Sequence, residues 1–200
     1  QGQGDILMRG NTQTREFLIP LLDKKNGLRT DRLLTHIDLI KMPEYPKLIA
    51  IGDVTVTIEP NLNQKKEIIR NMVGTAGYEK PNIALLSMVE QVSFHMKDTV
   101  EAQELVKEHK SKPIADCNLV GPIAYDLILS KEAARLKGYD NPLCGDFDGI
   151  IVPSLLAGNL IVKCWQMHAH AKTCGVIVGA KIPVALTSRS DDKDVSFLSL

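Results

Sequence analysis

The segment 184–194, near the carboxyl end, holds the densest group of side chains that could do chemistry. An apolar strand is expected to run into the polar turn Thr187-Ser188-Arg189, which then opens a helix. Ser188 or Ser190 could cap that helix and leave backbone N–H groups pointing at an anion, and the guanidinium of Arg189 matches phosphate oxygens. The carboxylates that follow are candidate general bases. Helix capping and a surface ion pair for Arg189 are the commoner explanation of such spacing, and this alternative stays open.

A second candidate follows an apolar strand that is expected to end at Val152. Gly158 permits a close approach of the backbone, and Asn159 offers both an amide donor and an acceptor. Lys163 lies about one helical turn further on. A turn followed by the start of a helix explains the same residues, and on spacing alone it is the better explanation.

Gly121 and Pro122 form a third and weaker candidate, ahead of an expected helix. Glycine suits a tight entry and proline suits the first helical turn, so structure alone explains the pair. The chain contains no P-loop and no G-x-G-x-x-G fingerprint that opens a helix. These absences argue against hydrolysis of nucleoside triphosphates and against a standard nicotinamide site.

The pattern C-x3-H-x-H-x3-C between Cys164 and Cys174 resembles a set of zinc ligands. A helix is expected over 157–172, however, and about 100° of rotation per residue would turn the first two ligands away from the last two. Four ligands could not converge from opposite sides of one helix, so no metal site is predicted. His36 and His95 are interpreted as packing or surface residues.

The elements that must position these residues alternate between strands and helices. Short apolar runs predict strands over 5–8, 33–41, 48–52, 83–87, 149–152 and 175–179. Apolar residues at helical spacing predict helices over 14–24, 62–76, 99–109, 123–137 and 157–172. This alternation predicts an α/β fold with helices on both faces of a largely parallel sheet. Ligands of such sheets bind beyond the carboxyl ends of the strands, which directs attention to the loops after Gly52, Ser87, Val152 and Leu186.

The composition narrows the class of function. The chain has 200 residues, with 24 basic and 24 acidic side chains, so its net charge gives no electrostatic argument for binding to nucleic acid or to a membrane surface, and neither partner is expected. No apolar run is long enough to span a bilayer, and the first residues, Gln1–Asp5, show neither a basic leader nor an apolar signal core. The four cysteines are expected to be reduced thiols in the cytoplasm. The chain lacks a starting Met, and we expect it to be a fragment.

Segments in order along almost the whole chain resemble the phosphate acetyltransferase and phosphate butyryltransferase family, nearest to its butyryl or branched-chain branch. The most specific are Val152-Pro153 followed by Ala157-Gly158-Asn159, and Gly179-Ala180-Lys181 followed by Leu186-Thr187-Ser188-Arg189. The others are Asp5–Gly10, Gly27–Thr30, Pro60–Lys65, Gly121–Asp126 and Ser130–Ala134. Each segment alone is weak, and their joint order and spacing are strong.

The resemblance implies two three-layer α/β/α domains with a cleft between them, related to the fold of isocitrate and isopropylmalate dehydrogenases. Both chain ends, here 1–36 and 184–200, would form the first domain, and 37–183 would form the second. Family members extend past both ends of this chain, so the first domain is expected to be truncated. The resemblance also implies a cytoplasmic homo-oligomer.

The implied reaction is acyl-CoA plus phosphate giving acyl phosphate plus coenzyme A, on a short or branched acyl group. Coenzyme A is a substrate, and no covalently bound cofactor and no metal are implied. By family analogy Ser188 would hold the thiol sulfur, Arg189 would bind phosphate, and Asp194, with Asp191 in reserve, would take the thiol proton. The residues that would line the cleft and bind substrate are Thr187, Gly158, Asn159, Lys163, Gly121 and Pro122.

Three positions depart from the family pattern. Ile19 stands where members usually carry Arg or Lys, Val120 replaces an acid before the Gly-Pro pair, and Thr57 replaces an Asn. Arg9 or Arg15 could compensate for the missing basic group. These departures motivate an alternative, a catalytically weakened paralogue that binds acyl-CoA. A second alternative is the related acyl-carrier-protein phosphate acyltransferase, although the segment 187–189 favours the coenzyme A branch.

Overall fold

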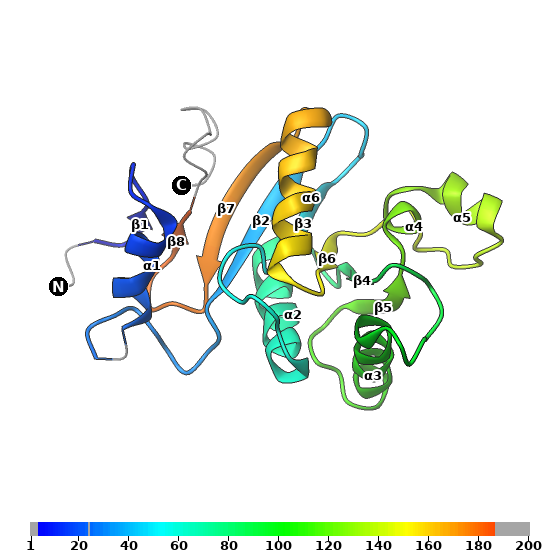
Figure 1. Ribbon diagram of the computed structural model, residues 1–200, viewed down its shortest axis with the longest axis horizontal. Coiled ribbons are helices and arrows are strands. Elements are labelled where there is room, and N and C mark those ends of the chain that lie inside the picture. Colours follow the sequence, from blue (N-terminus) through cyan, green and yellow to red (C-terminus); the bar gives the residue numbers. More distant parts are fainter. Residues whose placement is uncertain (1–3, 24, 187–200) are drawn as a thin grey trace.

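The computed structural model of the chain describes residues 4–23 and 25–186. Eight strands form one sheet in the order β1-β8-β7-β2-β3-β6-β4-β5 (Figure 1). The strands are β1 (Leu7–Met8), β2 (Thr35–Lys41), β3 (Leu48–Gly52), β4 (Asn82–Leu86), β5 (Asn118–Ile123), β6 (Gly149–Ile151), β7 (Lys172–Val178) and β8 (Val184–Ala185).

The sheet is mixed, so the prediction of a largely parallel sheet is only partly correct. Strands β3, β6, β4 and β5 are parallel neighbours, whereas β2 pairs antiparallel with both β3 and β7, and β8 pairs antiparallel with β7. The connection from β2 to β3 covers only residues 42–47, which is too short for the crossover that a parallel pair needs. The short connection therefore forces the antiparallel pairing.

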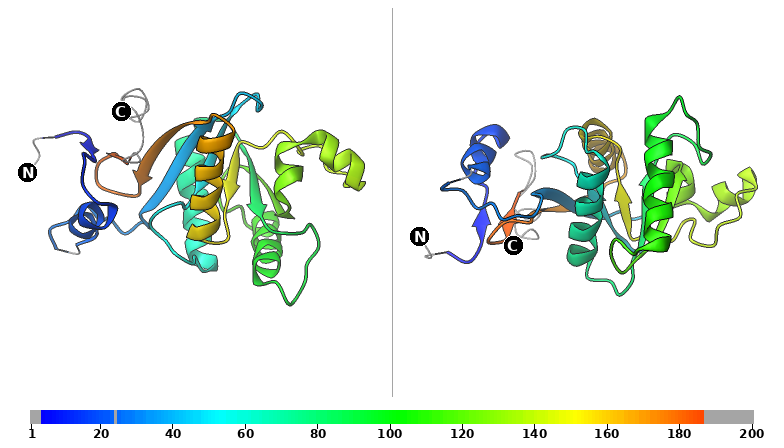
Figure 2. Two further views of the ribbon diagram at one scale, coloured as in Figure 1. Left: turned by 45° about the horizontal axis from the view of Figure 1, so that its top comes forward. Right: turned by 90° about the horizontal axis from the view of Figure 1, so that it is seen from below.

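The helices cover both faces of the sheet. The helices are α1 (Thr14–Leu22), α2 (Leu62–Ala76), α3 (Lys97–Ser111), α4 (Tyr125–Leu129), α5 (Lys131–Lys137) and α6 (Leu155–His168). Figure 2 shows α6 and α2 on opposite sides of the strands. One buried cluster joins α2 and α3 to the sheet, and another joins α4, α5 and α6 to the other face. Along β3, Ile49 and Ile51 belong to the second cluster and Ala50 to the first, as expected from the alternation of side chains in a strand. The predicted α/β class is confirmed.

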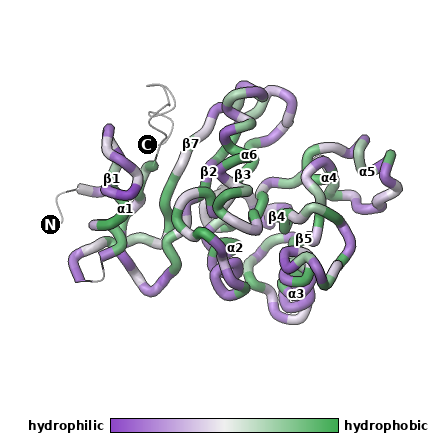
Figure 3. The backbone as a smooth tube through the Cα atoms, viewed as in Figure 1, coloured by the Kyte–Doolittle hydropathy of each residue, from purple (hydrophilic) through white to green (hydrophobic). Residues whose placement is uncertain are grey.

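Helix α2 shows how the local sequence sets an element. Asn61 accepts a hydrogen bond from the backbone N–H of Gln64, and the side chain of Gln64 accepts one from the N–H of Asn61, so a capping box starts the helix. Gly77 ends it in the left-handed conformation. Helix α3 is mostly hydrophilic in Figure 3 and buries only Thr99, Ala102 and Leu105. It therefore forms the outer cover of the sheet near β5.

Two predicted helices differ from the structure by more than two residues. The expected helix 123–137 is two short helices, α4 and α5, preceded by strand β5, which the sequence did not predict. Gly121 and Pro122 lie inside β5 rather than at a helix start. Proline is tolerated there because β5 is the edge of the sheet. Glycine is needed because a Cβ at position 121 would lie 2.5 Å from Cβ of Leu85 on β4.

The expected helix 157–172 ends at His168, and β7 begins at Lys172. The reason given against a zinc site, ligands on opposite sides of one helix, is therefore wrong, because the helix does not continue that far. His170 has a positive φ of 49° and Cys174 lies in β7. Within residues 4–23 and 25–186, no three His, Cys, Asp or Glu side chains lie close enough together to hold a metal ion.

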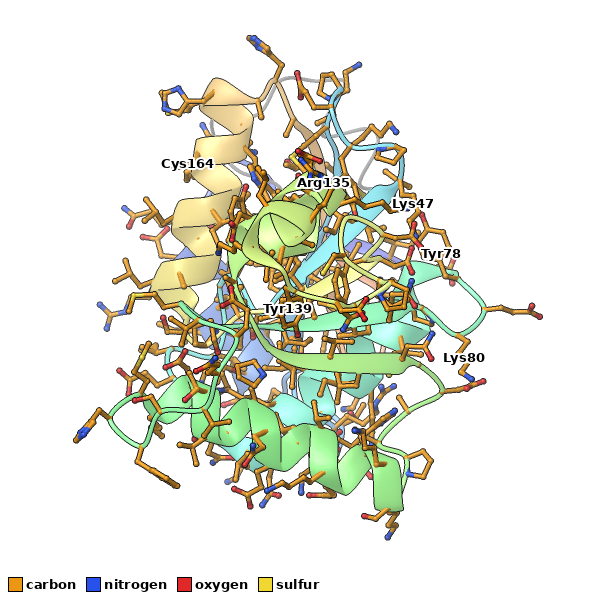
Figure 4. The ribbon with its side chains drawn as sticks, turned by 90° about the vertical axis from the view of Figure 1, so that its right-hand side faces the viewer. Lys47, Tyr78, Lys80, Arg135, Tyr139 and Cys164 are labelled. Carbon is orange, nitrogen blue, oxygen red and sulfur yellow. The ribbon has the colours of Figure 1, made fainter. Side chains whose placement is uncertain are left out.

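None of the helices in the described ranges combines the length and the apolar character that a membrane span requires. The four cysteines are free thiols. Burial raises the pKa of the Cys117 thiol to about 11, whereas Cys164 is exposed on the outer side of α6 (Figure 4). Cys164 is therefore the thiol that we expect to react first with a reagent in solution.

Candidate functional site

The carboxyl ends of the parallel strands lie in one row. Gly52 at the end of β3 pairs with Ile151 at the end of β6, and Ile151 pairs with Leu85 near the end of β4. The loops that follow these strands therefore leave the sheet along the same edge, as the sequence predicted for the loops after Gly52, Ser87 and Val152. The prediction for the loop after Leu186 is wrong, because β8 runs in the direction opposite to β3 and its carboxyl end points away from that edge.

The loop after β3 is held by a buried carboxylate. Oδ1 of Asp53 accepts hydrogen bonds from the backbone N–H groups of Thr55 and Val56 at 2.9 Å, and Oδ2 accepts one from Thr57 at 3.1 Å. Asp53 is 1% exposed. Burial raises the pKa of the Asp53 carboxyl, while the three N–H donors and nearby His36 act in the opposite direction. Since one side chain ties three consecutive backbone groups, we expect the loop 53–57 to be rigid.

The amino end of α6 packs against this loop. Ser154 caps the helix, because its hydroxyl accepts from the N–H of Ala157 at 3.3 Å. A Cβ added to buried Gly158 would lie 3.0 Å from a methyl group of Val54 and 3.2 Å from the carbonyl oxygen of Asp53. Asn159 Nδ2 lies 3.5 Å from the carbonyl oxygen of Val54. The structure thus brings Gly158 and Asn159 together with the loop 53–57, and close packing explains the glycine.

The other substrate-binding candidates are placed differently. Half-buried Lys163 lies on α6 beyond Asn159, and its ammonium donates to Gln166 at 3.3 Å. Gly121 and Pro122 lie on β5, two strands beyond β6 in the sheet, so the structure does not bring them against Gly158. Thr187, Ser188, Arg189 and Asp194, with the reserve Asp191, lie outside the described residues.

Strand β8 and Leu186, which follows it, precede those residues in the chain. The N–H of Leu186 donates to Gly175 on β7 at 2.9 Å, and Leu186 is 3% exposed. On the other side, the N–H of Arg9 donates to the carbonyl of Ala185 at 3.0 Å. Arg9 is buried, and its guanidinium donates to the hydroxyl of Thr14 at 2.8 Å. A buried cation therefore lies beside the strand that enters the segment 187–194.

Two buried polar side chains lie against the same strand end; His36 was interpreted from the sequence as a packing or surface residue, and Asp38 was not singled out. His36 and Asp38 on β2 are 5% and 8% exposed. The imidazole Nε2 of His36 lies 3.4 Å from Oδ1 of Asp38, and its Nδ1 lies 2.7 Å from the hydroxyl of Thr55. Their signal was two polar residues at i and i+2 on one face of an apolar strand. His95 is exposed, in line with its interpretation as a surface residue.

A second buried cation, Lys65 on α2, borders a small pocket at the carboxyl ends of β4 and β6. Its ammonium lies 2.7 Å from Oε2 of Glu101 on α3. Lys65 belongs to the segment Pro60–Lys65 that carried part of the family resemblance, but its burial was not predicted. The carboxylate of Glu101 balances the buried charge of Lys65, and the ion pair links α2 to α3.

Comparisons with known proteins show which family the chain resembles. The family described as phosphate acetyl/butaryl transferase matches residues 1–198. The chain is 35% identical to the phosphate acetyltransferase of Thermotoga maritima, covering all of this chain and 69% of that protein. It is 35% identical to the probable phosphate butyryltransferase of Bacillus subtilis, covering 98% of this chain and 67% of that protein. The chain thus spans about two thirds of the length of these relatives.

A solved structure shares the fold and about a third of the residues of this chain. The branched-chain phosphotransacylase of Enterococcus faecalis V583 is 34% identical, with a TM-score of 0.88, over all of this chain and 72% of that chain. The match to the family model and the identity to these relatives extend over nearly the entire sequence. The chain belongs to the phosphate acetyl/butyryl transferase family.

Proposed function

We propose that the full-length protein containing this chain transfers a short or branched acyl group between coenzyme A and inorganic phosphate. The reaction is acyl-CoA plus phosphate giving acyl phosphate plus coenzyme A. The observation that carries the proposal is the family match over residues 1–198, together with the likeness to a branched-chain phosphotransacylase. Coenzyme A and its esters are substrates here, and phosphate is the second substrate. Four free thiols support a reducing, cytoplasmic location.

The proposed chemistry uses the segment 187–194. In the thioester-forming direction, the thiol of coenzyme A loses its proton to Asp194, attacks the carbonyl carbon of the acyl phosphate and expels phosphate. A free thiol has a pKa of about 8.5, so a base and hydrogen-bond donors raise the thiolate fraction at neutral pH. Ser188 would hold the sulfur, and Arg189 would bind the phosphate and stabilise negative charge. Thr187 would line the same site.

The loop 53–57 with Gly158 and Asn159 is proposed as the opposite wall of the site. Asn159 is exposed at the start of α6, so its amide can reach a ligand. Lys163 is proposed to lie along the same helix face, and its charge suits an anionic substrate. Gly121 and Pro122 would belong to a more distant part of the coenzyme A site, on the outer strand of the same sheet.

We propose that 1–36 and 184–200 belong to one domain, truncated here, and 37–183 to a second, in the manner of isocitrate and isopropylmalate dehydrogenases. A small cluster joins the two chain ends, since Leu21, Leu34, Val184 and Leu186 pack together, and Ile177 of the second domain also belongs to it. In Figure 1, α1, β1 and β8 lie at one end of the sheet. The substrate cleft would then lie between the two domains.

A homo-oligomer is also part of the proposal. Leu156, Leu160 and Met167 on α6 are 75%, 59% and 74% exposed, and with exposed Cys164 they fall on one side of the helix. An apolar stripe of this kind suits a protein contact. Light scattering of the full-length protein, with Leu160→Lys as the disrupting variant, tests whether α6 lies in a subunit interface.

The function is tested by supplying acetyl-, butyryl- and isobutyryl-CoA to the full-length protein with and without phosphate. We expect phosphate-dependent formation of both free coenzyme A and acyl phosphate, with faster turnover of the butyryl or isobutyryl ester. Acyl phosphate must be measured directly, because free cysteine thiols of the protein add to the signal of a thiol reagent. Release of coenzyme A that does not depend on phosphate would contradict the proposal.

One observation favours the alternative of an acyl-CoA-binding paralogue. Ile19, at the position where relatives usually carry a basic residue, is 57% exposed on α1. A basic group that could have met phosphate there is absent. Binding of butyryl-CoA without any turnover by the full-length protein, and recovery of turnover in Ile19→Arg, would select this alternative.

A further inference from the structure

We propose that His36 is a positioning residue that joins the two walls of the acyl-transfer site. The inference rests on the proposed function, because its effect is expected in catalysis. His36 is 5% exposed, so it acts through other residues rather than by touching substrate. It contacts one wall through Nδ1 and faces the other wall through Nε2.

The first wall is the loop 53–57. Nδ1 of His36 lies 2.7 Å from the hydroxyl of Thr55, in a loop whose backbone is already tied to Asp53. The carbonyl of His36 accepts from the N–H of Val54 at 3.3 Å. Since Val54 and Asp53 form the surface on which Gly158 packs, any shift of Thr55 reaches the amino end of α6.

The second wall is the strand end at Leu186. His36 and Asp38 point to the same side of β2, towards Gly175 on β7. A Cβ added at Gly175 would lie 2.6 Å from both Nε2 of His36 and Oδ1 of Asp38, and 2.3 Å from the carbonyl oxygen of Leu186. The imidazole of His36, the carboxylate of Asp38 and the carbonyl oxygen of Leu186, which follows β8, therefore meet over Gly175. The chain continues from there into Thr187, Ser188 and Arg189.

These contacts give His36 a role that an aliphatic residue could not fill. The burial of an imidazole and a carboxylate next to each other costs free energy unless polar groups compensate. Within the described ranges, Nε2 has no hydrogen-bond partner, although it lies 3.4 Å from Oδ1 of Asp38. His36 is thus a buried polar residue at a position where an apolar side chain could pack. It links the loop 53–57, beside Asn159, to Leu186, which precedes the proposed catalytic segment.

The test uses paired substitutions in the full-length protein. His36→Asn keeps a polar group near the position of Nδ1, so it can still reach Thr55, whereas His36→Gln places its amide nearer to Nε2. Thr55→Val removes the hydroxyl and keeps the shape. We expect His36→Gln and Thr55→Val each to lower kcat by about tenfold, because the two walls are then held less precisely around the reacting groups, with KM changed less than about threefold. His36→Asn should recover most of the loss, and so should Thr55→Ser.

The surface variant His95→Gln is the matched control, and it should leave both constants unchanged. The double variant His36→Gln/Thr55→Val should be no slower than the worse single variant, because both remove the same contact. If the wild type turns over and both His36→Gln and Thr55→Val keep kcat within twofold, the inference is wrong even when their melting temperatures fall. If His36→Gln does not fold, Thr55→Val decides alone. A wild type that does not turn over contradicts the proposed function instead.

Discussion

The described chain has two regions that differ in the size of their buried core and in the length of their strands. We call 37–183 the main region, and 4–23, 25–36 and 184–186 together the edge region. The largest fully buried side chains all lie in the main region, among them Phe147, Ile68 and Met72. The edge region contains only two short strands, β1 and β8, of two residues each. Its small buried cluster has five residues, and the fifth, Ile177, comes from the main region.

The difference shows where the candidate site obtains its rigidity. The pairing of β2 with β7 extends over seven residue pairs, whereas β8 pairs with β7 and with β1 over two pairs each. The loop 53–57 and Gly158 are therefore held by the larger core. The strand that enters the segment 187–194 has little sheet of its own, so the buried contacts at Leu186 and Gly175 carry more of its placement.

The largest expected effect is in the core of the main region. Phe147 is fully buried, and its carbonyl accepts from the hydroxyl of Tyr45 at 2.7 Å. Phe147→Ala should lower the free energy of unfolding by about 3–5 kcal/mol, because it leaves a cavity in a tightly packed cluster. Urea unfolding followed by the fluorescence of Trp165, the only tryptophan, measures the loss. Phe94→Ala, at a side chain that is 91% exposed, is the control and should change stability by less than about 0.5 kcal/mol.

The edge region should respond to an equivalent change without disturbing the main region. Leu21 on α1 is 3% exposed and packs in the small cluster. We expect Leu21→Ala to cost about 2–3 kcal/mol locally, seen as faster amide hydrogen exchange in 14–22 and 184–186. The Trp165 transition should stay near its wild-type midpoint. A shift of that midpoint as large as the one caused by Phe147→Ala would show that the two regions unfold together and would break the comparison.

Two glycines in helices should respond with opposite signs. Gly158→Ala places a methyl group 3.0 Å from Val54 and Val152 and 3.2 Å from a backbone oxygen, so it should destabilise by about 1–2 kcal/mol and slow turnover. Gly74→Ala on α2 meets no atom within 4 Å and should stabilise by up to about 1 kcal/mol. The melting temperatures of the two variants measure this difference, because Gly158 is closely packed whereas Gly74 only lowers the stability of its helix. Stabilisation by Gly158→Ala would contradict the packing described at the site.

The smallest effect concerns an exposed ion pair of the main region. The ammonium of Lys137 lies 2.9 Å from Asp126 and lowers the pKa of that carboxyl. A depressed pKa stabilises the fold above the ordinary value of about 4, and this contribution is lost as the pH falls through the folded value. Because the pair is exposed, solvent screening reduces the effect to a few tenths of a kcal/mol. The difference in unfolding free energy between wild type and Asp126→Asn should shrink between pH 6 and about pH 3. An unchanged difference would show that the pair contributes nothing.

Elements governed by local signals could be predicted from the sequence. The bounds of α2 were predicted correctly because an apolar face follows the cap at Asn61. Strand β5 was missed because Gly121 and Pro122 resemble a helix entry, and only its edge position in the sheet makes proline acceptable. The antiparallel half of the sheet depends on pairings between strands far apart in the chain, such as β2 with β7, which no local pattern specifies.

The candidate site shows the same limit. Gly158 and Asn159 were found because a glycine at a helix start is a local signal, and the structure places them on the loop 53–57. The role of Asp53 was not predicted, because its carboxylate holds the loop only when the backbone folds back so that three N–H groups point at it. The meeting of His36 with Gly175 and Leu186 joins three strands, so it could not be deduced from spacing.

The most direct test of the central claim is the thioester-forming reaction of the full-length protein with butyryl phosphate and coenzyme A, compared with Ser188→Ala. We expect wild-type turnover, and a loss in kcat of about 100-fold in Ser188→Ala, as for removal of one hydrogen-bond donor to a developing charge. The Trp165 unfolding transition should be unchanged in that variant, which shows that the fold is intact. Turnover of Ser188→Ala within twofold of wild type would contradict the assignment of the acyl-transfer site to this segment.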